Sequence, residues 1–293
     1  MSEGSVLSEA AAQVEDADCP LCGSAERSQR YSFPPFAVVR CAACRFHYLS
    51  PRLTRSAMEE IYRAGDYFEG GAVGYESYAR QEQALRATFR AVARRLSSHG
   101  FAGGDLLEIG AGYGLLLDEA AGYFASVTGT ELSAAATVEA RRRGRNVITG
   151  GIDELPTGVR FDCVLAGHVI EHVYEPRVFV GQLAGLLRPG GALILGTPFM
   201  GSFWQRLMGS RWPSFKIPEH VLYFDRRSLS GLLAEAGLRD VKPFPYPHAF
   251  PLALVLGKVG LGAIGPRLGR LGELPIWLPA TTLAYSARRP PDG

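Results

Sequence analysis

A glycine-rich turn constrains the fold of this chain more than any other stretch. In residues 106–114, LLEIGAGYG, a short apolar run ends at Glu108 and leads directly into three glycines. These are Gly110, Gly112 and Gly114. Glycines permit a tight turn and let a ligand approach the backbone closely. Because the spacing is G-x-G-x-G, it differs from the G-x-G-x-x-G of a dinucleotide-binding loop. The stretch predicts a buried strand, a ligand-binding turn and a helix.

Short apolar runs alternate with helical stretches along the rest of the chain. The predicted strands are Asp105–Gly110, Ser126–Glu131, Asn146–Gly150, Phe161–Gly167, Ala192–Pro198, Asp240–Phe244 and Thr282–Arg288. The predicted helices are Tyr75–His99, Leu115–Phe124, Ala134–Arg143, Arg177–Leu187 and Arg226–Ala236. Alternation of this kind implies an α/β fold whose mostly parallel sheet is covered by helices on both faces.

An acidic residue ends the strand that follows the glycine turn. Glu131 closes the run SVTGTE, and a carboxylate at that position can accept both ribose hydroxyls of an adenosine ligand. A glycine turn alone fits many doubly wound proteins. Together with Glu131 and the order of the later strands and helices, it favours a nucleoside ligand.

Four cysteines form two close pairs near the N-terminus. Cys19, Cys22, Cys41 and Cys44 have the spacing C-x2-C-x18-C-x2-C, which is typical of a structural zinc site. Four thiolates at tetrahedral corners suit one Zn²⁺ and leave no open coordination position. Free cysteines are the less favoured interpretation. The pattern also fits a reducing compartment, so the predicted location is the cytoplasm.

The stretch HVIEHV, His168–Val173, matches the H-x-x-E-H pattern of a zinc protease. That site needs both histidines on one continuous helix. Here the preceding FDCVLAG is a predicted strand, so His168 lies at its end and His172 lies on or near the next helix. We therefore predict no shared metal site for this pair. For Glu171 and His172, packing and polar cover at the start of a helix are the favoured interpretation.

These stretches carry a family resemblance. LLEIGAGYG, GTELS, FDCVLAGHVIEHV and LLRPGGALILGTP, in this order, resemble class I S-adenosylmethionine-dependent methyltransferases over roughly residues 75–289. The resemblance implies a Rossmann-like, seven-stranded, mostly parallel sheet with a reversed last strand. It implies a cofactor site formed by Glu108, Gly110, Ala111, Gly112, Gly114, Glu131, Leu132, Asp153 and His168. The family often has Gly-Asp after the third strand, whereas this chain has Gly150-Gly151, which leaves the adenine contact of Asp153 open.

The zinc pattern narrows the resemblance. A four-cysteine module followed by HYLSPR and by KIPEHVLYFDRRSL is similar to bacterial methyltransferases of nucleotide-linked sugars and natural products, of the zinc-containing sugar C-3-methyltransferase type. The resemblance implies that His220 is the general base, with Glu219 orienting it or contacting the substrate. Those enzymes have a longer C-terminal portion, so the substrate itself does not transfer.

Several further residues are candidates for the active site. His168 ends a predicted strand, and ligands of open α/β sheets bind at the carboxyl ends of the strands, so His168 is a candidate for contact with cofactor or substrate. The other candidates for substrate contact are Tyr75, Tyr78, His172 and Tyr223. Packing is an equally good interpretation for the first two.

The chain divides into four predicted parts. Residues 1–17 form a disordered tail, 18–55 the zinc-binding module, 56–100 a helical linker or lid, and 101–293 the methyltransferase domain. An apolar insertion covers about residues 249–277. Within it, Leu252–Ile264 could line a substrate pocket, a dimer face or a weak membrane contact, and the sequence does not decide among them.

Composition excludes some classes of partner. The net charge of +2 and the pI of about 8.3 are low for a dedicated nucleic-acid binder. No run of residues is long and apolar enough for a transmembrane segment. We expect methyl transfer to a small molecule. The alternatives are a zinc-ribbon rRNA methyltransferase and a non-catalytic zinc-ribbon binding or scaffold protein.

Overall fold

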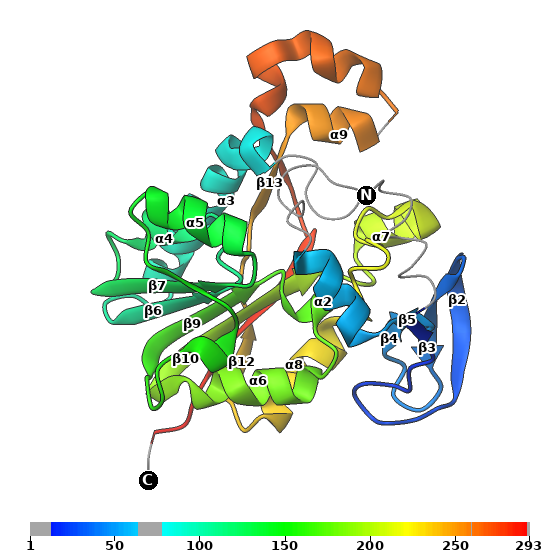
Figure 1. The fold of residues 1–293 in the computed structure, drawn as a ribbon, viewed down its shortest axis with the longest axis horizontal. Helices are drawn as coiled ribbons and strands as arrows, with labels where there is room; N and C mark the ends of the chain where they lie inside the picture. Colours follow the sequence, from blue (N-terminus) through cyan, green and yellow to red (C-terminus); the bar gives the residue numbers. More distant parts are fainter. Residues whose placement is uncertain (1–12, 64–77, 259, 292–293) are drawn as a thin grey trace.

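The computed structural model of the 293-residue chain describes residues 13–63, 78–258 and 260–291 (Figure 1). Its largest sheet has seven strands in the order β12-β15-β10-β9-β6-β7-β8. Their bounds are Arg239–Pro243 (β12), Thr282–Arg288 (β15), Leu187–Pro198 (β10), Phe161–Gly167 (β9), Asp105–Ile109 (β6), Ser126–Glu131 (β7) and Val147–Thr149 (β8). β15 runs antiparallel to β10 and β12, and the other neighbours are parallel. The predicted fold class and the reversed last strand are confirmed.

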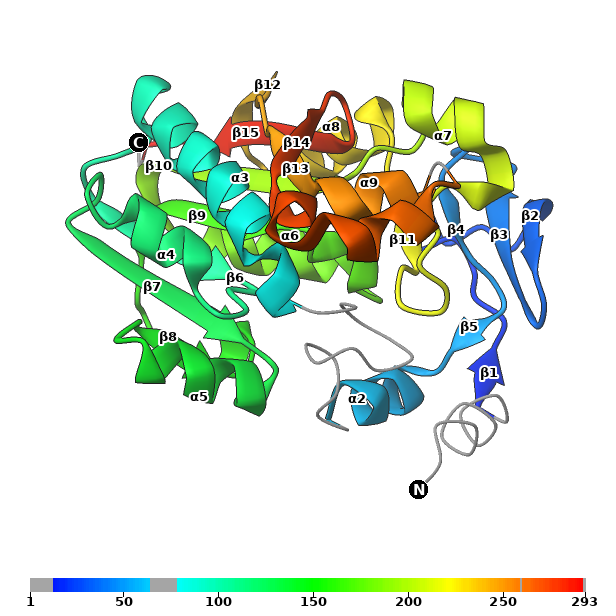
Figure 2. The same ribbon diagram turned by 90° about the horizontal axis from the view of Figure 1, so that it is seen from above.

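Helices cover both faces of this sheet, as the alternation of side chains along its strands requires (Figures 1 and 2). Leu106 of β6 belongs to the core under α3 and α4, whereas Leu107 belongs to the core under α6 and α8. α5 lies beside β7 and β8. The helix bounds are Tyr78–Ser98 (α3), Leu115–Ala120 (α4), Ala134–Arg142 (α5), Pro176–Gly185 (α6) and Arg226–Glu235 (α8).

The cysteine-containing module has its own sheet, at the end of the molecule away from β7 and β8 (Figure 2). Its strands, in the order β11-β4-β3-β2, are Leu222–Tyr223 (β11), His47–Leu49 (β4), Phe36–Cys41 (β3) and Arg27–Phe33 (β2). β11 comes from the large domain and pairs antiparallel with β4. Phe46 of the module also contacts Phe224, with ring centroids 4.9 Å apart. Buried residues of the module and of the large domain therefore share one hydrophobic core.

Residues 14 and 15, which the sequence assigns to the disordered tail, form a short strand. Val14–Glu15 (β1) pairs with Arg52–Leu53 (β5), and Arg52 Nε bonds Glu15 Oε1 at 2.9 Å. Two residues carry no strand period, so this pairing depends on contacts that are distant in sequence. Residues 1–12 lie outside the described residues. After β5, the chain forms the helix Arg55–Arg63 (α2).

The predicted apolar insertion is two helices between two paired strands. His248–Pro251 (β13) pairs antiparallel with Pro275–Leu278 (β14), and between them lie Leu252–Lys258 (α9) and Gly262–Glu273 (η5). Ala249 N donates to Thr88 Oγ1 at 2.8 Å, which anchors the hairpin on α3. No helix within the described residues is long and apolar enough to cross a membrane.

Candidate cofactor and active site

The glycine turn has the backbone that its sequence predicts. Gly110, Gly112 and Gly114 have φ angles of 74°, 53° and 69°, which side chains other than glycine rarely adopt. A Cβ atom at Gly110 would lie 2.7 Å from Val169 Cγ2. The turn therefore needs glycine for backbone conformation at all three positions and for space at Gly110.

Glu131 joins the glycine turn to the next strand. Its carboxylate accepts from Gly112 N at 2.9 Å and from Ser133 N at 2.8 Å. Burial raises the pKa of Glu131, while these backbone donors act in the opposite direction. The ends of β6 and β7 thus present one buried carboxylate at the carboxyl edge of the sheet.

A second acid lies beneath the turn. Glu108 is buried, and its Oε2 makes no hydrogen bond to any residue that the structure describes. Burial, together with the Glu131 charge, raises the pKa of Glu108 well above its usual range. A buried polar atom without a partner is costly, so Glu108 Oε2 is a candidate for contact with a ligand.

The remaining predicted cofactor residues differ in their surroundings. Ala111 packs into the core with Leu117 and Val147, so its side chain does not face a ligand. Leu132 directly follows β7 and is 66% exposed. Asp153 is exposed in the short helix Ile152–Glu154 (η2) after β8. Of these three, Leu132 and Asp153 remain accessible at the edge where a nucleoside is predicted.

His168 lies directly after β9, with φ 59°. Its Nδ1 is 3.3 Å from Glu171 Oε1, and its Nε2 is 3.2 Å from Thr282 Oγ1. The ring also lies edge-on to His248, with centroids 5.2 Å apart. Thr282 and His248, which the sequence did not indicate, therefore belong to the surroundings of His168.

Glu171, His172 and His220 form a second group beside His168. Glu171 and His172 lie in the single turn Ile170–His172 (η3). His168 lies before this turn, so the two histidines of HVIEHV do not share one continuous helix, as a zinc-protease site would require. The rings of His172 and His220 are 4.7 Å apart and perpendicular. Val221 N donates to Glu171 O at 2.8 Å, which ties the two segments together. Glu171 and His172 thus pack beside His220 in the turn after β9, and their roles in a reaction remain predictions.

The protonation of this group follows from its burial. Burial alone would raise the pKa of Glu171, but the surrounding histidines, His168 first, lower it to about 2. Burial lowers the pKa of His220 to about 3 and lowers that of His172. Glu171 is consequently charged at neutral pH, while His172 and His220 are neutral imidazoles.

Two neighbours of His220 are buried. Tyr223 is 2% exposed, and its hydroxyl donates to His220 O at 2.7 Å, while its contact with a substrate remains a prediction. Glu219 is also buried, and its carboxylate accepts from Lys216 Nζ at 3.0 Å. Tyr75 lies outside the described residues. Tyr78 begins α3, and its side chain lies outside them too.

The two cysteine pairs adopt the same turn. Gly23 N donates to Cys19 O at 2.8 Å, and Arg45 N donates to Cys41 O at 3.1 Å. Gly23 and Arg45, each directly after the second cysteine of its pair, have φ angles of 74° and 68°. Each C-x-x-C pair is therefore a tight knuckle closed by a left-handed residue.

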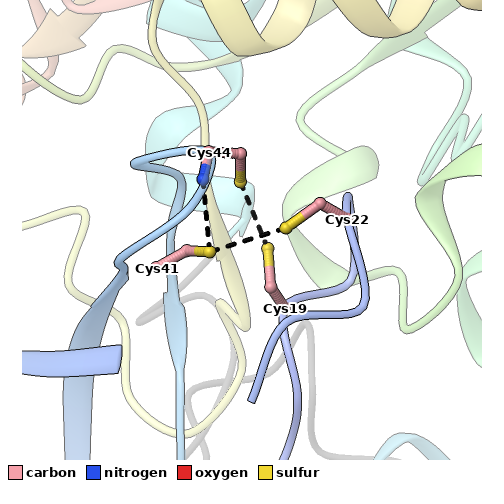
Figure 3. Close-up of side chains that lie close together, drawn as sticks. All are labelled: Cys19, Cys22, Cys41 and Cys44. Atoms are coloured by element: carbon pink, nitrogen blue, oxygen red, sulfur yellow. Dashed lines mark hydrogen bonds between the residues drawn. The ribbon is translucent and has the colours of Figure 1, made fainter. Parts of the chain in front are cut away.

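The two knuckles bring the four sulfurs together (Figure 3). Cys19 Sγ is 3.4 Å from Cys44 Sγ, and Cys22 Sγ is 3.5 Å from Cys41 Sγ. All four sulfurs lie within 4.8 Å of one another, and none forms a disulfide. Zn–S bonds of about 2.3 Å would place tetrahedral sulfurs about 3.8 Å apart. The cluster therefore fits one Zn²⁺ ion.

A basic groove of about 960 Å³ lies between the module and the large domain. Asp225, the N-cap of α8, is the sole carboxylate among the described residues that line it. Its arginines are Arg30, Arg40, Arg206, Arg226 and Arg227. The groove reaches residues 199–201, just after β10, and Ala280, just before β15. It therefore borders the strand ends that carry Thr197 and Thr282.

Comparison with known proteins identifies the family. A family model described as a methyltransferase domain matches residues 78–242, more than half of the chain. The chain belongs to this methyltransferase family. The predicted enzyme class is thereby confirmed, and the matched segment contains the glycine turn, Glu131 and the Glu171–His220 group.

Two relatives with known functions match part of this chain in sequence. A ubiquinone biosynthesis O-methyltransferase of Bradyrhizobium is 32% identical over 118 residues, which are 38% of this chain and 43% of the relative. The same enzyme of Cereibacter sphaeroides is 30% identical over 48% of this chain and 62% of its own length. This methyltransferase thus spans about half the length of these relatives.

Among solved structures, one is a SAM-dependent methyltransferase of Thermotoga maritima, titled a possible histamine N-methyltransferase. It superposes with a TM-score of 0.50 and 19% identity, and the match covers 71% of this chain and 90% of that one. One of Archaeoglobus fulgidus gives a TM-score of 0.50 and 17% identity over 72% and 99%. At these identities the likeness concerns the fold.

Proposed function

We propose that this methyltransferase transfers the methyl group of S-adenosylmethionine to a phosphate-bearing small molecule, with a sugar hydroxyl as the acceptor. One observation supports this most strongly. The buried carboxylates of Glu108 and Glu131, on the glycine turn, lie at the same edge of the sheet as the charged Glu171 and its histidines. One edge thus offers a nucleoside site beside a group suited to proton transfer.

The chain's residues fit this cofactor. Glu131 would bind the ribose hydroxyls, the glycine turn would admit the methionine portion, and Glu108 offers the unsatisfied acceptor described above. The cofactor supplies a sulfonium whose methyl group is displaced in line. Holding the two reactants together contributes roughly 7–11 kcal/mol to such a step. Positioning is therefore the main contribution of the chain.

An acceptor hydroxyl must also lose its proton. The predicted catalytic residues His168 and His220 both lie beside Glu171, and a placed base contributes about 10²–10⁴-fold. We assign proton removal to this group. Glu219 supports it indirectly, because its carbonyl oxygen lies 3.2 Å from His172 Nδ1.

The basic groove supports an anionic acceptor. Five arginines facing one carboxylate create a positive potential that favours phosphate oxygens. A nucleotide-linked sugar could place its phosphates there and its sugar toward the strand ends near Thr197 and Thr282. The O-methyltransferases named above support oxygen as the acceptor atom. We further propose a structural Zn²⁺ in the cysteine cluster.

Cofactor binding tests the core of this proposal. Titration calorimetry of the full chain should show one S-adenosylmethionine per chain, and Gly112→Arg should abolish the binding because it fills the turn. Gly158→Ala is the control, since Gly158 also has a positive φ of 81° but lies in an exposed turn with nothing within 4 Å of a new Cβ. Equal binding by wild type and Gly112→Arg would reject the site.

The acceptor class is tested separately. In the double variant Arg226→Ala/Arg227→Ala, KM for a nucleotide-linked sugar should rise at least about tenfold, because two charge-assisted contacts are lost. KM for S-adenosylmethionine should stay unchanged. Methylation of an rRNA fragment in place of nucleotide sugars would instead support the RNA alternative, and turnover independent of these arginines would reject the groove as an acceptor site.

A further inference from the structure

Three side chains with metal-binding atoms converge behind His168. Glu171 and His172 come from η3, after β9, and His220 precedes β11. One ligand atom of each lies within 4.8 Å of the ligand atoms of the other two. The backbone bond from Val221 N to Glu171 O, 2.8 Å long, holds the two segments in this arrangement. The group is therefore preformed by the fold.

The hydrogen bonds of the two histidines orient them as metal ligands. His220 Nδ1 lies 2.9 Å from Ser214 O, and His172 Nδ1 lies 3.2 Å from Glu219 O. A carbonyl oxygen only accepts, so in both rings Nδ1 carries the hydrogen and Nε2 keeps its lone pair. Metal-bound histidines typically donate their other N–H to a carbonyl in this way.

The carboxylate supplies an independent observation. Glu171 is 1% exposed, and its Oε2 accepts from Thr197 Oγ1 at 3.0 Å. Its Oε1 lies 3.3 Å from His168 Nδ1 but makes no hydrogen bond within the part of the chain that the structure describes. A buried carboxylate is costly unless a cation or donors compensate it. Thr197 and His168 supply part of that compensation, and a metal ion beside Oε1 would add to it.

We propose that Glu171, His172 and His220 bind one divalent transition-metal ion. Two imidazole nitrogens and one carboxylate oxygen are a donor set that Zn²⁺, Mn²⁺ and Fe²⁺ share, and three protein ligands leave positions open for other molecules. The coordination sphere of this ion would thus not be filled by protein ligands alone, unlike that of the cysteine cluster.

The role of the ion rests on the proposed function. Its open position would bind the acceptor oxygen next to the cofactor. His220 Nε2 then ligates the ion, so His220 is a metal ligand and His168 is the residue left to take the proton.

Metal analysis of the untagged full chain tests the proposal without an activity assay. After dialysis against Zn²⁺, or anaerobically against Mn²⁺ or Fe²⁺, the wild type should hold one ion more than the zinc of the cysteine cluster. Glu171→Gln, which keeps shape and removes charge, should weaken binding of this second ion at least about tenfold. His99→Gln, at an exposed position directly after α3, is the control and should bind it as the wild type does.

A second readout covers variants that fold poorly. The second ion should raise the melting temperature of the zinc-loaded wild type but not that of folded Glu171→Gln. A wild type that holds one metal under all three conditions would overturn the proposal, as would equal second-ion binding by Glu171→Gln. Calorimetry with S-adenosylmethionine separates the two proposals, because loss of the ion site leaves cofactor binding intact.

Discussion

The four-cysteine cluster and the Glu171–His172–His220 group are two candidate metal sites built in opposite ways. Each cysteine pair lies within one turn, and the two pairs are joined by a short hairpin of β2 and β3. The second group joins η3 to a segment nearly fifty residues later, through the ends of several strands. The first site can therefore be predicted from spacing, and the second becomes visible only when the fold is known.

Their chemistry differs in the same way. Four thiolates close the coordination sphere of zinc, which suits a structural role. Two histidines and one carboxylate leave it open, at the edge where a methyl acceptor would lie. We therefore expect changes in the cysteine cluster to affect stability first, and changes in the Glu171 group to affect turnover first.

The largest expected effect is on the cysteine cluster. Cys41→Ser should remove the zinc and lower the free energy of unfolding by about 4 kcal/mol or more, because the module shares its core with the large domain. Denaturant unfolding and zinc analysis measure both quantities. Cys163→Ala, at a buried cysteine outside the cluster, is the control and should keep its zinc. A stable, zinc-free Cys41→Ser protein would contradict a structural metal.

The next effect separates turnover from stability. His220→Asn should lower kcat at least about 10²-fold, the contribution of a placed base or of an ion it holds. Affinity for S-adenosylmethionine and zinc in the cysteine cluster should stay unchanged. Steady-state kinetics with calorimetry on the folded fraction provides the measurement, with His99→Asn as the control. Full turnover in His220→Asn would remove this residue from the active site.

A smaller effect is expected from the support of Glu171. Thr197→Val keeps the shape of a fully buried side chain but removes the hydroxyl that donates to Glu171 Oε2. Leaving that oxygen without a donor should cost about 1–3 kcal/mol of stability in the metal-free protein. Thermal unfolding with and without divalent ions measures it. No change under either condition would mean that the bond does not stabilise the group.

The smallest expected effect concerns the left-handed residue that closes each cysteine knuckle. Arg45 occupies the left-handed position that Gly23 occupies in the other knuckle. Arg45→Gly should remove backbone strain and raise the free energy of unfolding by up to about 1 kcal/mol. Arg30→Gly, in the extended strand β2, should instead destabilise the module. Denaturant unfolding distinguishes them, and a destabilised Arg45→Gly protein would show that the Arg45 side chain matters more than its backbone.

Much of the large domain was predictable because its strands are buried on both faces. Runs such as FDCVLAG and ALILGTP are mostly apolar, and the glycine turn shows where the first strand ends. The boundaries were less certain: α4 ends at Ala120 instead of Phe124, and α6 ends at Gly185 instead of Leu187. Helix ends depend on tertiary contacts that sequence periodicity does not contain.

The parts that were missed all depend on contacts distant in sequence. β11 has two residues, and its pairing with β4 cannot be read from two residues. The groove arginines come from four elements that are separate in sequence. Thr282 could have been found, because a reversed last strand places its own first residue at the carboxyl edge of its neighbours. The burial of Glu171 beside two histidines was not predicted, because an acidic residue at this place in the sequence is also common at the start of a helix.

The central claim is that the cofactor and the Glu171 group share one site. A crystal structure with S-adenosylhomocysteine tests this claim most directly. We predict that the ribose hydroxyls bind Glu131 and that the sulfur faces the side of the turn where His168 and Glu171 lie. A cofactor bound away from Glu131, or one whose sulfur points away from His168 and Glu171, would contradict the proposed active site.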